Sequence, residues 1–135
     1  MKIICDTEKC TGCLACVVAC RDAHDPAGAP DSLSRRLYRR ITEASGYTHY
    51  VTGSCRHCAG APCAAACPAA AISRSAAGWV TVDAEKCIGC RRCAAACPFG
   101  VPRFGAQGKM TKCDGCGGAP RCIPFCPNGA LRLER

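Results

Sequence analysis

Residues 86–99 read KCIGCRRCAAACPF and are the most informative part of this 135-residue sequence. Their four cysteines have the spacing C-x2-C-x2-C-x3-C, and a proline follows the last of them directly. Related groups of four occur three more times, so that sixteen of the 17 cysteines fall into quartets. In order along the sequence, quartet one is Cys10, Cys13, Cys16 and Cys20; quartet two is Cys55, Cys58, Cys63 and Cys67; quartet three is Cys87, Cys90, Cys93 and Cys97; quartet four is Cys113, Cys116, Cys122 and Cys126.

The quartets differ from one another only in small details. Arg21 follows quartet one, whereas Pro68, Pro98 and Pro127 follow the other three. Quartets two and four have a longer gap between their second and third cysteines. Cysteine runs of this kind bind [4Fe–4S] clusters through their thiolates. The pattern therefore predicts four [4Fe–4S] clusters, with all sixteen quartet cysteines as ligands, in a chain that carries electrons.

The composition fits a small protein that depends on bound metal. A length of 135 residues allows one compact unit or two very small ones. Only 5% of the residues are aromatic, and alanine and cysteine supply much of the 49% hydrophobic content. Small domains with so thin an apolar core usually need metals or disulfides. We expect the clusters to fill that role.

Two other uses of cysteine compete with this interpretation. Disulfides are disfavoured because 17 is an odd number and because the N-terminus, MKIICD, has no charged leader followed by an apolar stretch. Cysteines in a reducing compartment more often bind metal, so we expect a cytoplasmic location. Structural zinc sites use two separated C-x2-C pairs and not runs of four that end in C-P. A structural zinc protein is therefore the less favoured alternative.

The formal charge of +8 does not by itself indicate a nucleic-acid surface. A cluster with its four thiolates contributes about −2, so that four clusters offset about eight positive charges. We therefore expect no nucleic-acid partner. No apolar run has the length of a membrane span, so we expect no direct span either. The sequence also lacks a phosphate-binding loop, a dinucleotide fingerprint and a catalytic constellation, which argues against an active site of its own.

Short strands and turns are expected between the quartets. Glycines precede the second cysteine of three quartets, where the loop is expected to wrap tightly and to need their freedom. The expected elements are strands at residues 2–5 and 130–133, which could pair with each other; a helical turn at 14–20; a loop at 22–34 with Pro26, Gly28 and Pro30; a hairpin of residues 39–43 and 48–52 around Ser45-Gly46; and a hairpin of residues 71–73 and 79–82.

The order of these elements predicts an α+β fold made of two nested modules, each like a small bacterial ferredoxin. The outer module combines residues 1–21 with residues 101–135 and carries quartets one and four. The inner module, residues 55–100, carries quartets two and three and is an insertion in the outer one. Residues 22–54 form a connecting loop and hairpin, and residues 101–112 cross back from the inner module.

The last cysteine of each quartet is expected to bind a different cluster from the first three. A proline after this cysteine ends the helical turn and directs the ligand away, and in two-cluster ferredoxins the fourth cysteine ligates the other cluster. In the nested layout this predicts four ligand sets. They are Cys10, Cys13, Cys16 and Cys126; Cys113, Cys116, Cys122 and Cys20; Cys55, Cys58, Cys63 and Cys97; and Cys87, Cys90, Cys93 and Cys67.

Longer stretches around the quartets resemble a known family. They are CRHCAGAPC at residues 55–63, CIGCRRC at 87–93 with PFGVP at 98–102, and KCDGC at 112–116. These stretches are similar to the four-cluster iron–sulfur subunits of the dimethyl-sulfoxide-reductase type. The resemblance covers nearly the whole sequence and all sixteen ligand positions. It implies a subunit that moves single electrons between a partner's active site and another carrier.

The resemblance also implies the kind of partner. Small members resemble the electron-transfer subunits of formate dehydrogenases, hydrogenases, carbon monoxide dehydrogenases and tungsten aldehyde oxidoreductases. The expected partner is a large catalytic oxidoreductase subunit with a molybdenum- or tungsten-pterin or nickel centre, and a flavin or ferredoxin carrier would exchange electrons with the chain. The loop from Cys116 to Cys122 is short and no long tail follows quartet four, which favours a minimal cytoplasmic subunit. The alternative is a free soluble polyferredoxin, or a wire that grows by self-association.

Some residues outside the cluster pattern have a simple expected role and a more specific alternative. Cys5 is expected to be a buried, inert thiol and not a ligand. His57, within quartet two, is expected to be a solvent-exposed spacer and not a group that tunes the cluster. A basic cluster is expected to be a solvated face that offsets the charge of the iron–sulfur sites, with docking of an acidic partner as the alternative. Its members are Arg35, Arg36, Arg39 and Arg40.

Overall fold

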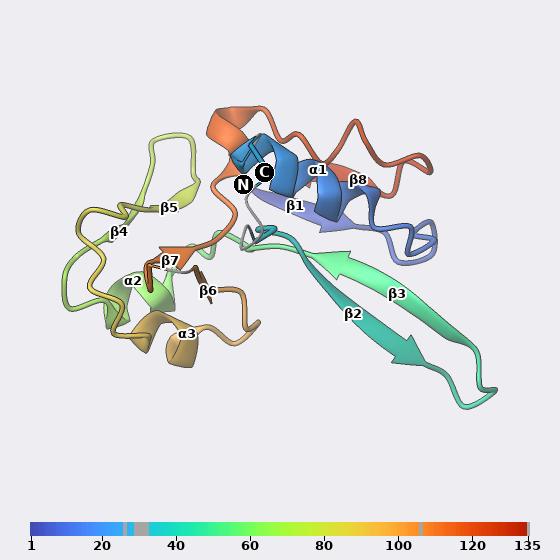
Figure 1. Ribbon diagram of the computed structural model, residues 1–135, viewed down its shortest axis with the longest axis horizontal. Helices are drawn as coiled ribbons and strands as arrows, with labels where there is room; N and C mark the ends of the chain where they lie inside the picture. The colour runs from blue at the N-terminus through green and yellow to red at the C-terminus, as the bar shows by residue number, and fades with distance from the viewer. Residues whose placement is uncertain (26, 29–32, 106, 135) are drawn as a thin grey trace.

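Short strands and short helices make up the computed structural model, which describes residues 1–25, 27–28, 33–105 and 107–134. Each strand pairs antiparallel with one other, so the described residues contain four two-stranded sheets (Figure 1). The elements are β1 (Lys2–Cys5), α1 (Ala15–His24), β2 (Leu37–Thr42), β3 (Thr48–Gly53), α2 (Pro62–Ala66), β4 (Ile72–Arg74), β5 (Val80–Val82), α3 (Arg92–Ala96), β6 (Arg103–Phe104), β7 (Met110–Thr111), the 3-10 helix η1 (Gly115–Gly118) and β8 (Leu131–Glu134).

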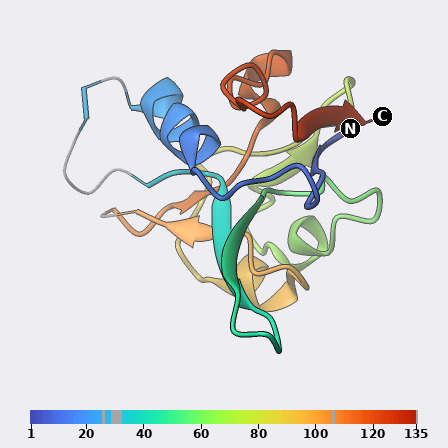
Figure 2. The ribbon, with the colours of Figure 1, turned by 90° about the vertical axis from the view of Figure 1, so that its right-hand side faces the viewer.

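The two ends of the chain meet in one sheet. Strand β1 pairs with β8, with Lys2 opposite Glu134 and Cys5 opposite Leu131. Figures 1 and 2 accordingly show the two termini side by side. Both strands turn an apolar side chain inward, because Ile3 and Leu131 are buried. The expected pairing of the end strands is therefore confirmed.

A second group of elements lies at the other end of the molecule. Strand β4 pairs with β5 as a hairpin, with Ile72 opposite Val82, and α2 packs against α3 (Figure 1). The hairpin expected between quartets two and three is confirmed. Strands β6 and β7 form another small hairpin within residues 101–112, where we expected a simple crossing. Each of these strands has two residues, and a segment of that length shows no periodic pattern from which a strand could be predicted.

Strands β2 and β3 form the longest hairpin and project from the rest of the molecule (Figures 1 and 2). This hairpin was expected around Ser45-Gly46, and each strand is slightly displaced or extended relative to the prediction. Helix α1 differs more, because it continues to His24 into the expected loop of residues 22–34. Arg21 and His24 lie in its last turn, where a positive side chain interacts favourably with the helix dipole. Pro26 and Pro30, which supported the loop prediction, lie outside the described residues.

Two turns with the same sequence pattern introduce quartets one and three. Residues 6–10 and 83–87 both read D-x-E-K-C. In each turn the aspartate side chain accepts a hydrogen bond from the backbone N–H two residues later, at 3.0 Å, and its carbonyl accepts one from the cysteine N–H. Both turns leave the lysine, Lys9 or Lys86, exposed. This repeat was not predicted, although its five-residue pattern is visible in the sequence.

The buried side chains form two groups, and cysteines are found in both. One group surrounds Ile3, Trp79 and Leu131, and the other surrounds Val80 and Met110. The buried cysteines are Cys16, Cys20, Cys93, Cys113 and Cys122. The thin apolar core expected from the composition is thus completed by quartet side chains. None of the helices in the described ranges has the length and hydropathy needed to cross a bilayer.

Candidate iron–sulfur centres

Tight loops present the first three cysteines of each quartet. In quartets one, three and four the glycine before the second cysteine has a positive φ of 71–74°, as expected. Gly115 also has no space for a side chain, since a Cβ there would lie 2.4 Å from Cδ2 of Trp79. Leu14 and Arg91 adopt left-handed backbone angles just before α1 and α3 begin. These left-handed residues let the backbone of each loop curve around the site that its cysteines face, and a short helix begins directly afterwards.

The end strands and α1 enclose the first ligand set. One small cavity is lined by Cys10, Cys13 and Cys16 of quartet one together with Cys126 of quartet four. The structure therefore brings together the four cysteines that the crossed pairing places in one set. Cys5 lines the same cavity and is half-buried. It was expected to be an inert strand residue, but it lies beside this ligand set.

Two further cavities lie among the elements between residues 55 and 112. The cysteines that line one of them are Cys55, Cys58, Cys63 and Cys97. The other is lined by Cys67, Cys87, Cys90 and Cys93. Each cavity thus has three cysteines from one quartet and the last cysteine of the other. Apolar groups such as Val80 and Met110 line much of the rest of the two walls, together with the charged residues Arg56, Lys112 and Arg91.

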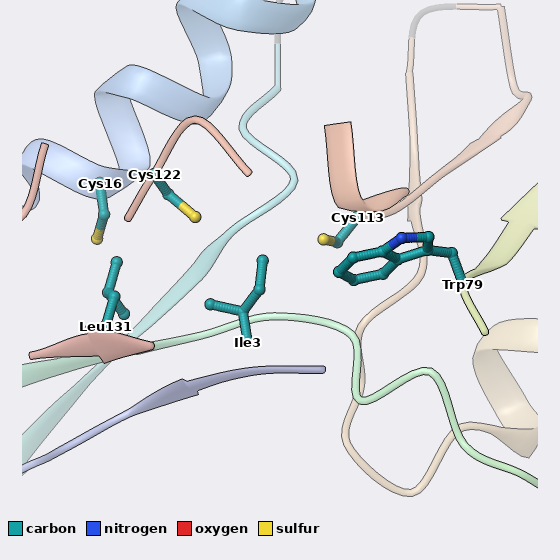
Figure 3. Close-up of a cluster of buried hydrophobic side chains, with 6 residues drawn as sticks. All are labelled: Ile3, Cys16, Trp79, Cys113, Cys122 and Leu131. Carbon is teal, nitrogen blue, oxygen red and sulfur yellow. The ribbon is translucent and has the colours of Figure 1, made fainter. Parts of the chain in front are cut away.

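The fourth ligand set gathers where α1 approaches η1. Cys20 lies close enough to Cys113 and to Cys122 for their thiolates to repel one another, and Cys122 interacts in the same way with Cys116. Figure 3 shows Cys113 and Cys122 in one buried cluster with Cys16 and Trp79. Burial raises the pKa of Cys113 to about 11. A thiolate at this position therefore needs a nearby positive charge, which iron would supply.

Backbone N–H groups point at several of the sulfurs. The amides of Ala71 and Ala130 donate to Sγ of Cys67 and Cys126, at 3.4 and 3.2 Å, each from four residues further along the sequence. The Ala71 amide lowers the pKa of the Cys67 thiol. Two further amides donate in the same way, from His57 to Cys55 and from Met110 to Cys87. Donors of this kind stabilise thiolates and help to set cluster potentials.

Two buried cations also contact the quartets. The side chain of Arg36, only 1% exposed, donates to Thr52 Oγ1 at 3.1 Å and reaches Cys122 Sγ at 3.8 Å. Lys112, 2% exposed, donates to Cys55 Sγ at 3.4 Å. Arg36 was expected to be part of a solvated basic face, and that expectation is wrong. Its guanidinium lies between Thr52 of β3 and Cys122, which follows η1 in the sequence.

The other arginines of the basic cluster have different surroundings. Arg35 forms an ion pair with Asp114 at 3.0 Å. Asp114 also accepts a hydrogen bond from His24, which raises the pKa of His24 to about 10. Arg39 and Arg40 are exposed on β2. The basic cluster is thus divided between the quartet-four site and the projecting hairpin.

His57 is buried and not solvent-exposed, so its expected role as a spacer is wrong. Only 2% of its surface is accessible, and its Nδ1 accepts a hydrogen bond from the Val80 amide at 2.8 Å. Its ring packs edge-on against Trp79, with 4.8 Å between the ring centroids. Burial, with the charge of Lys112, lowers the pKa of His57 to about 4. The neutral ring joins quartet two to the β4–β5 hairpin, a tertiary contact without a local sequence signal.

Comparison with known proteins identifies the family. The 4Fe–4S dicluster domain family matches residues 47–135, and a 4Fe–4S binding domain matches residues 7–23. This protein belongs to the 4Fe–4S dicluster domain family. Its few helices and short strands are consistent with a ferredoxin-like 4Fe–4S domain. The prediction of an iron–sulfur protein of this type is confirmed.

Several curated proteins are similar to this dicluster protein. The thiosulfate reductase electron transfer subunit PhsB of Salmonella typhi is 38% identical over 83 residues, which are 58% of this sequence and 42% of the relative. The B subunit of the anaerobic dimethyl sulfoxide reductase of Haemophilus influenzae is 39% identical over 95 residues, 59% of this sequence and 43% of the relative. The formate dehydrogenase iron–sulfur subunit of Wolinella succinogenes is 40% identical over 87 residues, with 64% of this sequence and 42% of the relative covered. The matched regions thus span less than half the length of these relatives.

The surroundings of the quartets fit the cofactor that the family implies. Thiols line three of the enclosed cavities, and backbone N–H groups are directed at several of those sulfurs. This donor set suits iron–sulfur clusters, whose sulfurs accept such hydrogen bonds. The cofactors of this dicluster protein are [4Fe–4S] clusters, and sixteen quartet cysteines suffice for four of them.

Proposed function

We propose that this protein is the electron-transfer iron–sulfur subunit of an oxidoreductase complex and has no active site of its own. The observation that carries the proposal is the composition of the cavities. Three cavities combine three cysteines of one quartet with the last cysteine of another, so that separate cluster sites share quartets within one small protein. Bound [4Fe–4S] clusters would supply one-electron chemistry in the 2+/1+ couple.

The ligand sets belong to the proposal. They are Cys10, Cys13, Cys16 and Cys126; Cys113, Cys116, Cys122 and Cys20; Cys55, Cys58, Cys63 and Cys97; and Cys87, Cys90, Cys93 and Cys67. Three sets are supported by the lining of the cavities, and the set with Cys20 by the proximity of Cys20 to Cys113 and Cys122. Crossed ligation of this kind ties each quartet to two sites.

The same crossing supports a nested layout. Quartets one and four would form an outer module from residues 1–21 and 101–135, and quartets two and three an inner module from residues 55–100. The β1–β8 pairing supports the first and the packing of α2 against α3 supports the second. Residues 22–54, which include the β2–β3 hairpin, would connect the two modules.

The residues of the protein have three tasks in this function. The quartet loops hold the ligands in place, the N–H donors and buried cations adjust the charge around each site, and the surrounding side chains limit the access of water. Cys13 and Cys90 are the exposed quartet cysteines of the described residues. They belong to two different ligand sets, one near each end of the molecule. Electrons would enter and leave near such positions, because the protein there is thinnest.

A large catalytic subunit is the proposed partner. The names of the relatives support it, since each is a component of a named oxidoreductase: thiosulfate reductase, dimethyl sulfoxide reductase or formate dehydrogenase. A molybdenum- or tungsten-pterin enzyme is the class of partner we propose, with a ferredoxin or flavin carrier on the other side. A cytoplasmic location is proposed with it on the basis of cysteine use.

Anaerobic purification from the native source tests this function. We expect about sixteen irons and as many sulfides per molecule, together with a larger co-purifying subunit that contains molybdenum, tungsten or nickel. The same iron content without a larger subunit would replace the proposal by a free polyferredoxin, or by a self-assembling wire if the protein elutes as an oligomer. Zinc without iron would overturn the proposal.

A further inference from the structure

Three of the four quartets begin with the dipeptide Lys-Cys, but the three lysines have different surroundings. Lys9 and Lys86 end the repeated D-x-E-K-C turns and are exposed. Lys112 follows β7 in place of such a turn, and only 2% of its surface is accessible. Quartet two begins with Ser54-Cys55 and has no lysine of its own. The structure therefore singles out Lys112 among residues with the same sequence context.

The ammonium group of Lys112 lies between quartets two and four. Its Nζ donates to Cys55 Sγ at 3.4 Å, to the Cys113 carbonyl at 3.1 Å, and to the Val80 carbonyl. Its side chain also lines the cavity of Cys55. Burial raises the pKa of Cys63, and the charge of Lys112 offsets part of that rise. The lysine thus touches one ligand of each of two proposed cluster sites.

No carboxylate of the described residues forms an ion pair with Lys112. A buried ammonium group needs a compensating negative charge, since desolvation of an isolated cation is costly. Cys55 and Cys113 lie close enough for their thiolates to repel each other, and Lys112 lies against both residues. The negative charge that matches this lysine is therefore the thiolate charge of the two neighbouring sites.

We propose that Lys112 is a positioning residue that raises the reduction potentials of two [4Fe–4S] clusters together, the one held by Cys55 and the one held by Cys113. The inference rests on the proposed function and deepens it. Reduction adds one negative charge to a cluster, and a buried cation at this distance stabilises that charge with little screening by water. Because one ammonium group serves both sites, it raises both potentials in the same direction. The reduced state is then stabilised at both sites between which an electron would cross from one module to the other.

The test is an anaerobic redox titration of the purified protein or complex, followed by electron paramagnetic resonance. Dithionite is the reductant, and each cluster accepts one electron from it. In Lys112→Met we expect two of the four midpoint potentials to fall, each by about 59 mV, which corresponds to a tenfold weaker affinity for the electron. Lys112→Arg keeps the charge and should keep the potentials within a fraction of that shift. Lys9→Met and Lys86→Met remove an exposed charge from the same Lys-Cys context and should change none of them.

The outcomes separate this inference from the proposed function. Unchanged potentials in Lys112→Met, with about sixteen irons present, would overturn the inference and leave the electron-transfer function intact. An equal fall in the Lys86→Met control would also overturn it. If Lys112→Met loses iron, Lys112→Gln, which keeps a donor without the charge, takes its place. Loss of iron in both uncharged variants but not in Lys112→Arg would assign Lys112 to cluster assembly and reject tuning. A wild-type protein without [4Fe–4S] signals would refute the function itself.

Discussion

The indole ring of Trp79 lies directly against the backbone of Gly115. A Cβ atom on Gly115 would be 2.4 Å from Cδ2 of Trp79, far inside normal contact. Trp79 comes from the turn before β5, and Gly115 begins η1 in quartet four. Trp79 also packs against Cys113 in the buried cluster of Figure 3. This contact therefore joins the hairpin of the middle segment to the quartet near the C-terminus.

Gly115→Ala should destabilise the protein through this contact. Gly129 is a matched control, since its φ of 62° is also left-handed but nothing lies within 4 Å of a Cβ there. Gly129→Ala should lower the free energy of unfolding only by the cost of a left-handed backbone at alanine, about 1–2 kcal/mol. Gly115→Ala should lower it by about 1–3 kcal/mol more, because the added methyl group overpacks the contact with Trp79. Thermal loss of the cluster absorbance measures both variants, and equal melting temperatures would contradict the role of Trp79.

The sequence was informative where function imposes a local spacing. The cysteine spacing identified the four quartets, and the segments between them identified the hairpins β2–β3 and β4–β5 and the pairing of the end strands. Left-handed angles at Gly12 and Gly89 followed from the need for tight loops. The loops and the two hairpins depend on residues close in the sequence, whereas the pairing of the end strands followed from their matching positions beside the outer quartets. A spacing argument can therefore reach them.

The sequence was least informative where tertiary packing determines burial. Lys9 and Lys112 precede cysteines in the same dipeptide, yet the first is exposed and the second is buried. His57 and Arg36 are polar residues for which exposure is the usual state, and both are buried by segments distant in the sequence. Nothing within a few residues marks His57 or Arg36 as buried. The repeated aspartate turns could have been found, because they mark two of the lysines as turn residues.

Combinations of cysteine variants test the crossed ligand sets. If Cys97 and Cys58 hold the same cluster, the double variant Cys58→Ala/Cys97→Ala should lose about four irons, no more than either single variant. Cys90→Ala/Cys97→Ala should lose about eight, because the two residues would then serve different clusters. Iron analysis after anaerobic purification measures both. The opposite pattern, with four irons lost in the Cys90 combination, would show that quartet three keeps its own last cysteine.

Cys5 should not be required for any cluster. Its thiol lines the first cavity, but Cys10, Cys13, Cys16 and Cys126 already provide four ligands there. Cys5→Ala should therefore retain the full iron content and an unchanged spectrum. A loss of about four irons would make Cys5 a ligand and would require a new assignment at this site.

Replacement of Arg36 should be costly, whereas replacement of an exposed arginine on β2 should not be. Arg36→Met removes the donors to Thr52 and Ser54 and the positive charge beside Cys122. The loss of buried partners predicts a destabilisation of about 1–3 kcal/mol. Arg40→Met, on the exposed hairpin, should change the stability by less than about 0.5 kcal/mol. Melting curves that coincide for the two variants would indicate that the buried contacts of Arg36 contribute nothing.

Removal of iron should unfold the protein and not merely inactivate it. Among the described residues, five of the sixteen buried hydrophobic side chains are quartet cysteines, so the core and the cluster sites overlap. Without iron, nothing links these cysteines to one another, and the remaining apolar side chains are too few to hold four separate two-stranded sheets. Treatment with an oxidant and a chelator should therefore abolish the amide protection of β4, β5, β1 and β8 in hydrogen exchange.

Addition of iron, sulfide and thiol should restore this protection, because metal binding is coupled to folding in such domains. Persistent protection of the β4–β5 hairpin in the iron-free protein would mean that the middle segment folds on its apolar contacts alone.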